Sequence, residues 1–370
     1  MIKKQRHYRK SALILTLMLV LTAILSACGG NKDNNAASPS TSAQASASAQ
    51  SSGEAASKEP SGELTKVRLQ LKWLPQTQFG GYFVALDKGY YKEEGLDVEI
   101  LPGGPDIIPE QQVANGAADI GNTWVAGLLS HQEEGFPLIQ IAQMSQKSGM
   151  LLISKKSAGI NTPADLKGKK VGAWMGGLEF EILALLEKYN LDSTKDVTLT
   201  KQGFTMDQFL NNQLDAASAL THNEYPLVLA AGVSENDVNV IDMNTEGVAM
   251  LQDNLFANSE WLADNQETAV KFLRASFKGW KDAIANPEEA TDIVMKSVDQ
   301  GSTTREHQLT MMKAIGALVL PEGTDNSKIG YIDAAAFKQT ADIALKFGVL
   351  KQEVDLSKAY TNEVWELATK

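Results

Sequence analysis

The chain has 370 residues, of which 45 are acidic and 34 are basic, so that its formal net charge at neutral pH is -11. This acidic balance, with no basic cluster outside the first ten residues, argues against nucleic acid as a partner. The chain has one cysteine, Cys28, and four histidines that lie far apart in the sequence. Disulfides, thiolate metal sites and structural zinc are therefore not expected.

The first 27 residues have the pattern of a secretory signal peptide. Five basic residues lie within the first ten positions, and an apolar run follows at residues 12–25. This run is shorter than the roughly 20 apolar residues that span a bilayer. Leu-Ser-Ala-Cys at residues 25–28 resembles the lipobox of bacterial lipoproteins, in which the cysteine carries the lipid. We expect a signal peptide at residues 1–27 and lipidation of Cys28; the alternative is an ordinary signal peptide with an incidental cysteine.

The segment at residues 28–65 is expected to be a flexible, lipid-anchored linker. It consists mainly of Asn, Ala, Ser, Gln and Gly and has hardly an apolar side chain larger than alanine. Such a composition buries too little apolar surface to offset the conformational entropy of folding. Acyl chains contribute about 0.8 kcal/mol per buried methylene, so a diacylated cysteine would hold the protein on a membrane. The expected location is extracytoplasmic, anchored to the bacterial cell membrane.

Strands and helices alternate through the first part of the remaining chain, of which about 305 residues are left to fold. Alternating apolar side chains predict a strand at residues 67–73, and later patterns predict further elements. Strands are expected at residues 96–101, 118–121 and 137–144, and helices at residues 79–91, 109–115 and 124–134. This alternation predicts an α/β fold with a mostly parallel, doubly wound sheet covered on both faces.

A second, smaller round of the same pattern follows. Strands are expected at residues 150–154, 169–174, 197–200 and 216–220, and helices at residues 178–189 and 206–212. Beyond residue 244 the pattern is strongly helical, at residues 259–285, 289–298, 305–318 and 333–347. We therefore expect two lobes, lobe I at residues 66–152 and 244–370 and lobe II at residues 153–243. Two crossing strands near Leu152 and Met243 would form the hinge, with a ligand cleft between the lobes.

Three tryptophans lie at or just beyond the ends of predicted strands. They are Trp73 and Trp124 in lobe I and Trp174 in lobe II. Ligands of open parallel sheets bind outside the carboxyl ends of the strands. A flat heteroaromatic ligand between such rings would gain about 0.5 to 1.5 kcal/mol per ring pair beyond area burial. The alternative is that each ring is a core residue, and Tyr82, a further candidate near Trp73, has the same alternative.

Polar side chains at the same corners would identify the ligand. Gln76 and Gln78 follow the first strand, and Asn223 and Glu224 follow a strand of lobe II. A carboxylate accepts from an amino group or ring N–H, and an amide both donates and accepts. Gly176 opens a helix in lobe II, where free backbone N–H groups could bind an anion. The alternatives are a solvated glutamate and a simple glycine turn.

Signatures of common enzyme classes are missing from the sequence. There is no Gly-x-Ser-x-Gly, no phosphate loop ending in Gly-Lys-Ser or Gly-Lys-Thr, and no His-Glu-x-x-His. Adjacent acidic residues such as Glu133 and Glu134 fit an exposed helix face better than a catalytic pair. We expect a binding protein without enzyme activity and without a cofactor.

Several segments together resemble a known family. They are KWLPQTQFGGYFVALDKGYYKEEGLDVEI at residues 72–100, ANGAADIGN at 114–122, NTPADLKGKKVG at 161–172 and THNEY at 221–225. They are similar to the thiamine-pyrimidine-precursor binders among the solute-binding proteins of ABC transporters. The resemblance is good over residues 67–251 and loose beyond. It implies a periplasmic-binding-protein-like fold that closes over its ligand, with ligand roles for Trp73, Trp124 and Glu224.

The resemblance leaves the ligand open between two ring systems. A thiamine pyrimidine precursor, of the hydroxymethylpyrimidine or formylaminopyrimidine type, is the first expectation. Riboflavin is the alternative, because Gly-Gly-Pro-Asp-Ile at residues 103–107 looks more like the riboflavin-binding branch. An alkyl sulfonate or nitrate is less favoured. The pyrimidine synthase branch needs a cysteine-rich iron-binding run, which does not occur after residue 28.

The same resemblance implies the partners. They are a small heteroaromatic ligand, an ABC permease with its ATPase, and the membrane through the lipid anchor. We expect a monomer. A sensor lipoprotein that signals without transport is a further alternative.

Overall fold

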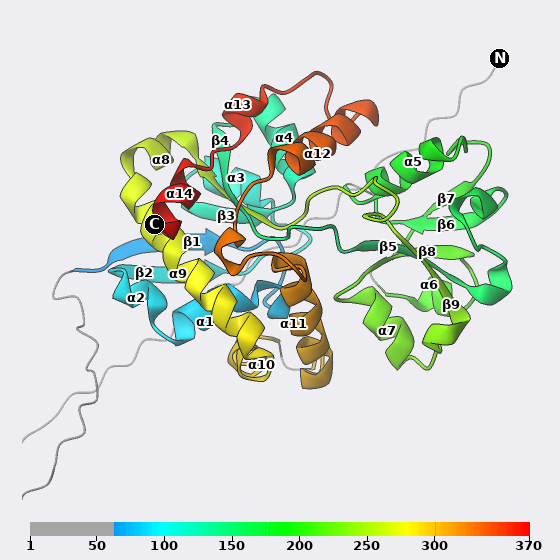
Figure 1. The fold of residues 1–370 in the computed structure, drawn as a ribbon, viewed down its shortest axis with the longest axis horizontal. Coiled ribbons are helices and arrows are strands. Elements are labelled where there is room, and N and C mark those ends of the chain that lie inside the picture. The colour runs from blue at the N-terminus through cyan, green and yellow to red at the C-terminus, as the bar shows by residue number, and fades with distance from the viewer. Residues whose placement is uncertain (1–62, 176, 204, 300) are drawn as a thin grey trace, which may run out of the picture. The chain divides into compact units, whose positions relative to one another are not determined.

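The structure is a computed structural model that describes residues 63–370 except 176, 204 and 300. The expected signal peptide, Cys28 and Gly176 lie outside the described residues. Within them, the helices are all too short or too polar to cross a membrane. The described chain is built on two five-stranded sheets (Figure 1).

The first sheet has the strand order β2-β1-β3-β10-β4. Its strands are β1 (Thr65–Gln70), β2 (Leu96–Leu101), β3 (Ile120–Thr123), β4 (Leu138–Gln143) and β10 (Asn254–Asn258). β1 pairs with β2 and β3 in parallel, whereas β10 lies antiparallel between β3 and β4. We call this sheet with the helices that pack on it lobe I.

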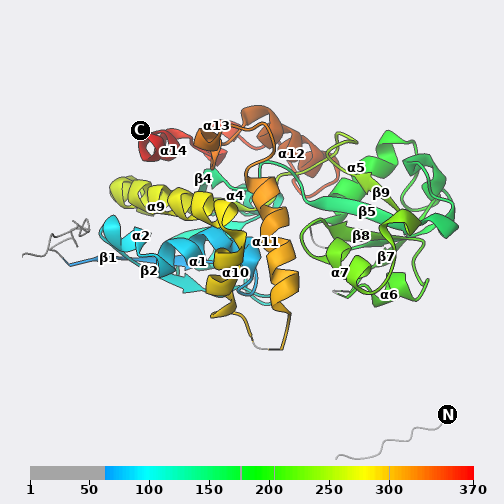
Figure 2. The same cartoon turned by 60° about the horizontal axis from the view of Figure 1, so that its bottom comes forward.

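Helices from both ends of the chain cover the first sheet. The early ones are α1 (Gly80–Asp87), α2 (Tyr90–Glu93), α3 (Pro109–Ala114) and α4 (Val125–Glu133). The later ones are α8 (Ser259–Asp264), α9 (Gln266–Ala285), α10 (Pro287–Met295), α11 (Arg305–Val319), α12 (Ala334–Lys346), α13 (Leu356–Ala359) and α14 (Glu363–Thr369). Short 3₁₀ turns add η1 (Thr77–Phe79) and η5 (Asn326–Lys328). Figure 2 shows α9 alongside α1, and Trp280 and Tyr82 from these two helices are both fully buried.

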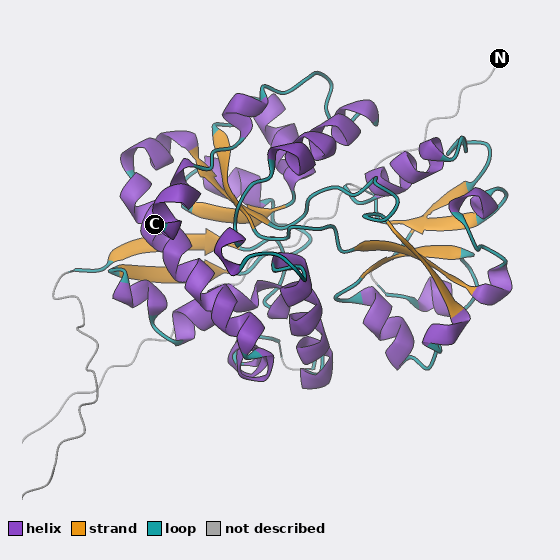
Figure 3. Ribbon diagram, in the orientation of Figure 1, coloured by secondary structure: helices purple, strands orange, loops and turns teal. Residues whose placement is uncertain are grey.

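The second sheet, the basis of lobe II, has the order β7-β6-β8-β5-β9. Its strands are β5 (Met150–Lys155), β6 (Lys170–Ala173), β7 (Thr198–Lys201), β8 (Ala216–Leu220) and β9 (Val238–Asp242). Its helices are α5 (Glu179–Lys188), α6 (Asp207–Leu210) and α7 (Glu224–Ala230), with 3₁₀ turns η2 (Lys156–Ala158), η3 (Pro163–Leu166) and η4 (Glu235–Asp237). Figure 3 shows helices on both sides of each sheet.

The two sheets have the same topology, which explains the repeated sequence pattern. In each, the first strand of the repeat (β1 or β6) lies between its two parallel partners. One further strand runs antiparallel between β3 and β4 in lobe I, and between β8 and β9 in lobe II. That antiparallel strand is β10 in lobe I and β5 in lobe II. Four of the five strands in each sheet therefore run in the same direction, as expected, and the fifth is the strand that each sheet receives from a crossover between the lobes.

The chain crosses between the sheets twice. It leaves the first sheet after Gln143 and enters the second at Met150, and it returns between Asp242 and Asn254. The crossovers are tied to each other and to α5: Asn244 donates to the Ser148 carbonyl, and the Ser148 hydroxyl donates to the Glu181 carboxyl group. These bonds hold the two crossovers together at the point where the chain passes between the sheets.

Candidate ligand-binding site

Trp124 lies where the two lobes meet. It is the residue before α4, at the end of β3, and its partly buried ring packs against the core of lobe II. A Cβ on Gly177 of lobe II would be 3.7 Å from Trp124 Cε3, and Lys72 Nζ lies 5.3 Å from the ring centroid. Trp124 thus has a lobe II backbone and a cation beside its indole.

A small cavity beside Trp124 is lined by both lobes and by the return crossover. Its volume is about 50 Å³. Lobe I contributes Lys72, Thr123, Trp124, Ala126 and Gly127, lobe II contributes Gly177, Leu178 and Glu181, and the crossover contributes Met250, Leu251 and Gln252. This space suffices for water but not for an aromatic ring. A ring therefore enters only when lining side chains or the lobes themselves move.

A chain of hydrogen bonds leads from the surface of lobe I to a buried carboxyl group. The Gln76 amide donates to Gln78 Oε1 at 2.6 Å, and Gln78 Nε2 donates to Asp253 Oδ2 at 2.8 Å. Burial raises the pKa of Asp253 to about 6, although the Gln78 and Trp124 side chains and the charge of Lys72 act in the opposite direction. The structure therefore connects two predicted residues, Gln76 and Gln78, to a carboxyl group that the sequence did not single out.

Other buried polar atoms around Asp253 have no hydrogen-bond partner among the described residues. They are Tyr82 Oη, Asn122 Oδ1, Trp280 Nε1 and Asp253 Oδ1. These four side chains line one narrow hollow with Gln78. Tyr82 meets Trp280 edge-on, with ring centroids 5.6 Å apart, so Tyr82 belongs to the packing of α1 against α9 as well as to this hollow. Buried polar groups without partners are costly, and such a group needs an explanation such as water or a ligand.

The predicted polar residues of lobe II are already engaged. Glu224 accepts from the backbone N–H of Leu220 and from Asn223 Nδ2, at 3.0 and 2.7 Å, and burial raises its pKa. The Asn223 Oδ1 atom lies 2.9 Å from Nε2 of His307, which is in the first turn of α11 in lobe I. Asn223 therefore forms a hydrogen bond between the lobes.

The remaining predicted residues occupy different surroundings. Trp174 donates from Nε1 to the Gly203 carbonyl within lobe II, and its partly buried ring packs against that lobe's core. Trp73 is partly buried against the core of lobe I, and its carbonyl accepts from the N–H of Gly103. The structure thus brings Gln76 and Gln78 to Asp253 and places Trp124 nearby. Trp174 and Glu224 make their hydrogen bonds within lobe II, and Asn223 bonds both to Glu224 and to His307 of lobe I.

Sequence reasoning missed Lys72, Glu181, Gln252 and Asp253. Glu181 is fully buried, and burial raises its pKa to about 8, although hydrogen bonds from Ser148 and from the backbone of Met250 oppose this. Gln252 and Asp253 belong to a polar run, Gln-Asp-Asn, whose last residue, Asn254, opens β10. A polar run before an apolar strand was the available signal, but this strand was itself not predicted.

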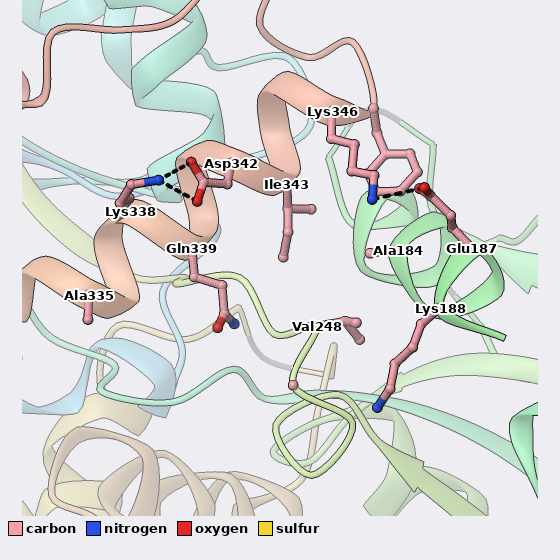
Figure 4. A pocket seen from close by; sticks show the side chains of 12 residues that line it. Ala184, Glu187, Lys188, Val248, Ala335, Lys338, Gln339, Asp342, Ile343 and Lys346 are labelled. Atoms are coloured by element: carbon pink, nitrogen blue, oxygen red, sulfur yellow. Dashed lines mark hydrogen bonds and ion pairs between the residues drawn. The ribbon is translucent and has the colours of Figure 1, made fainter.

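A larger groove lies elsewhere and does not fit a binding site of this kind. It has a volume of about 570 Å³ and lies between α12, α5 and residues 247–248. Figure 4 shows four of its five charged residues in pairs, Lys338 with Asp342 and Lys346 with Glu187, and the fifth, Lys188, pairs with Glu246 outside the lining. None of its lining residues, all of which the structure describes, has a buried polar atom without a partner. Four of the buried polar atoms without a partner lie instead in the hollow around Asp253.

Comparisons with known proteins agree with this architecture. A model of the NMT1/THI5-like family matches residues 76–290. The chain is 28% identical to the riboflavin-binding protein RibY of Chloroflexus aurantiacus, over 95% of this chain and 97% of that protein. It is 24% identical to the formylaminopyrimidine-binding protein of Halalkalibacterium halodurans, over 65% of this chain and 72% of that protein. The periplasmic aliphatic sulphonate binding protein SsuA of Escherichia coli has the same fold, with a TM-score of 0.60 at 19% identity over 80% of this chain and 92% of that one.

Proposed function

Because the chain belongs to the NMT1/THI5-like family and has the fold of periplasmic binding proteins, we propose that it is the solute-binding protein of an ABC importer. Two lobes joined by crossovers suit a protein that closes over its solute. Ligand binding favours closure only through contacts that the closed form makes better than the open one. Trp124, with lobe II backbone beside its ring, is in a position to make such contacts. An ABC permease and its ATPase would be the partners.

The proposed ligand is a heterocycle that contains a pyrimidine-type ring. Riboflavin is placed first, because the match to a protein named for riboflavin binding extends over 95% of the chain. The match to the formylaminopyrimidine-binding protein extends over 65%. This order reverses the expectation from the sequence, and a thiamine pyrimidine precursor is the second candidate. The long match is the observation that carries the proposal.

A sulfonate or nitrate ligand has less support, although the fold is shared with sulfonate-binding proteins. An oxyanion needs cations and N–H donors around it. Near Trp124 the chain has instead the buried carboxyl groups of Asp253 and Glu181, with Lys72 as the cation of the cavity lining. We also propose that the chain is no pyrimidine synthase, because it has no cysteine after residue 28 for an iron-binding run.

Titration of the purified full chain in detergent tests the ligand. Riboflavin and hydroxymethylpyrimidine are each added while tryptophan fluorescence and the melting temperature are followed. We expect quenching and a raised melting temperature with one of them, and at least tenfold weaker binding by Trp124→Ala. Trp261→Phe, a tryptophan on α8, serves as the control that binds as the wild type does. If neither compound changes the fluorescence or the melting temperature, the proposed ligand class is wrong.

The lipid anchor is proposed separately, from the sequence at residues 25–28. Mass spectrometry of the protein extracted from membranes should find a diacylated Cys28 at its N-terminus. Cys28→Ser should release the protein from the membrane fraction. An unmodified residue 28 in the membrane-bound protein would contradict lipidation.

A further inference from the structure

The return crossover is the place where buried polar atoms without partners gather among the described residues. Gln252 Nε2, Asp253 Oδ1 and both side-chain atoms of Asn254 have no hydrogen-bond partner, and all three residues are at most 6% exposed. Asn254 opens β10 opposite Thr123, at the carboxyl end of β3. This is the edge of the sheet where ligands of α/β proteins bind. We call these three consecutive residues, 252–254, the contact strip. Their unmet hydrogen bonds indicate that this part of the crossover contacts a polar ligand or water.

Asp253 is the member of this strip whose position is best fixed. Its Oδ2 atom accepts from Gln78, which is itself held by Gln76, so the carboxyl group cannot rotate without breaking its hydrogen bond to a side chain that is fixed in turn. It lies beside Trp124 and Lys72, which line the cavity between the lobes, and beside Tyr82 and Trp280 in the hollow of lobe I. Asp253 thus lines the hollow of lobe I and adjoins residues of the cavity between the lobes, and its Oδ1 atom is buried without a partner.

The charge of Asp253 decides what its free oxygen needs. The described residues provide no cation within 4.0 Å of it, and its fully buried carboxyl group ionises at about pH 6. A buried carboxylate is only an acceptor, so an N–H or O–H donor must satisfy it. A buried carboxylate oxygen without a hydrogen bond costs more free energy than a buried neutral polar atom without one. A partner that presents only oxygen acceptors, such as a sulfonate or nitrate, would be repelled.

We infer that Asp253 is a specificity-determining residue of the ligand site and accepts a hydrogen bond from a ring N–H or amino group of the ligand. This inference rests on the proposed function. It applies to both candidate ligands, because a flavin has an imide N–H on its pyrimidine-dione ring and an aminopyrimidine has an exocyclic amino group. The ligand class is an uncharged heterocycle with an N–H donor on the edge that enters the site.

Removing the N–H from the ligand tests the inference without changing the protein. Riboflavin is compared with 3-N-methylriboflavin, and hydroxymethylpyrimidine with its dimethylamino analogue, by titration of the full chain in detergent. We expect methylation to weaken binding at least tenfold for the compound that the wild type binds. The pair that shows binding at all distinguishes the two sources of the N–H.

The variant Asp253→Asn completes the cycle. Asparagine has only one side-chain oxygen, which can accept either from Gln78 or from the ligand N–H, but not from both. Its NH₂ group then faces the remaining N–H donor and cannot accept a hydrogen bond from it. We expect about tenfold weaker binding of the unmethylated compound and no further loss on methylation, because the methyl group then removes nothing. Asp282→Asn is the matched control. It changes an aspartate of α9 that forms a salt bridge with Lys88, and methylation of the ligand should weaken binding to this variant as much as binding to the wild type.

The outcomes separate this inference from the proposed function. Binding by the wild type with equal affinity for methylated and unmethylated compounds overturns the role of Asp253 and leaves the proposed function standing. The same holds if Asp253→Asn keeps the methylation penalty of the wild type. If the wild type binds neither riboflavin nor hydroxymethylpyrimidine, the proposed ligand class fails and the inference fails with it.

Discussion

The polar groups of the two lobes differ in how far the protein itself satisfies them. In lobe I, Asp253, Asn122, Tyr82 and Trp280 each have a buried atom with no partner among the described residues. In lobe II, both Glu224 oxygens and the Trp174 N–H are bonded within the lobe or to its neighbouring loop. Thr221 Oγ1 and His222 Nδ1 of lobe II are also buried without a partner, but most of the unmet hydrogen bonds among the described residues lie on lobe I and the return crossover. Lobe I is therefore the side that can gain most from a ligand.

This difference suggests a division of labour between the lobes. Lobe I and the return crossover would recognise the ligand, because their donors and acceptors are fixed in place and unpaired. Lobe II would close over it, since Asn223 already reaches His307 of lobe I. The sequence predicted edge contacts from both lobes, by Gln76 and Gln78 in lobe I and by Asn223 and Glu224 in lobe II. The variants below are chosen to break one side of the comparison at a time.

The largest effect is expected from Gly81→Ala in lobe I. The added Cβ would overlap the Trp280 ring, because α1 and α9 touch at this glycine. Either the helices separate or the indole turns, and overpacking of this kind costs about 3 kcal/mol of the free energy of unfolding. Urea denaturation measures it.

The matched change in lobe II is Gly172→Ala. There the Cβ would meet Gln202 Oε1 and Leu214 Cδ1 at 2.6 Å, which are the ends of side chains that can shift. We expect a loss of about 1 kcal/mol. Equal losses for both variants would mean that the packing beneath the unpaired groups of lobe I is no more rigid than that of lobe II.

Glu181→Gln should change the pH dependence of stability, with an effect of about 2 kcal/mol. The pKa of Glu181 is about 8 in the folded chain against an ordinary 4.5, so between these values the folded state holds a proton that the unfolded state has lost. The free energy of unfolding therefore falls as the pH rises from about 4.5 to about 8, by about 2 kcal/mol between pH 6 and pH 8.

Glutamine has no such proton, so this part of the slope should be missing in Glu181→Gln. The measurement is the difference in unfolding free energy between wild type and variant at pH 6, 7 and 8. Glu187→Gln, on the same helix but exposed in a surface ion pair, is the control. A constant difference across these three values would show that Glu181 does not ionise in this range and that the crossovers are not coupled to it.

Much of the fold could be predicted because its elements have clear apolar periods. The strands Leu96–Leu101 and Ala216–Leu220 have the predicted bounds, and the predicted helix at 178–189 is found as Glu179–Lys188. The family resemblance, drawn from quoted segments, is confirmed by the family match. The helix expected at 79–91 ends before Gly89, which has a φ of 77°, and a further short helix begins at Tyr90. One break was missed: the helix expected at 259–285 is divided at Asn265.

The crossover strand β10 and the groups before it could not be predicted from local pattern. Its five residues, Asn254–Asn258, gain their place from β3 and β4, which lie more than 100 positions away in the sequence. Asp253 likewise takes its partner from Gln78, 175 residues earlier. A local pattern locates corners of a sheet, but it does not show which corner has unpaired polar atoms. The roles of Trp73 and Trp124 in binding therefore stay predictions.

His307→Ala should weaken ligand binding about fivefold, a smaller effect than those above. The variant loses the hydrogen bond to Asn223 between the lobes, and a neutral hydrogen bond contributes about 1 kcal/mol. If this bond forms mainly on closure, the loss appears in the dissociation rate more than in thermal stability. His307→Gln, whose amide can donate to the same oxygen, should restore much of the affinity. Unchanged affinity in His307→Ala would show that this contact does not report on closure.

Trp174→Phe is expected to have the smallest effect. The variant keeps a ring against the lobe II core but loses the hydrogen bond from Nε1 to the Gly203 carbonyl. Because this site is partly exposed, water can take over the carbonyl, and we expect at most about 1 kcal/mol of stability to be lost. Ligand affinity should stay within twofold of the wild type, because the Trp174 N–H is already used within lobe II. A tenfold loss of affinity in a variant of normal stability would mean that lobe II also recognises the ligand. The proposal that recognition belongs to lobe I and the return crossover would then be wrong.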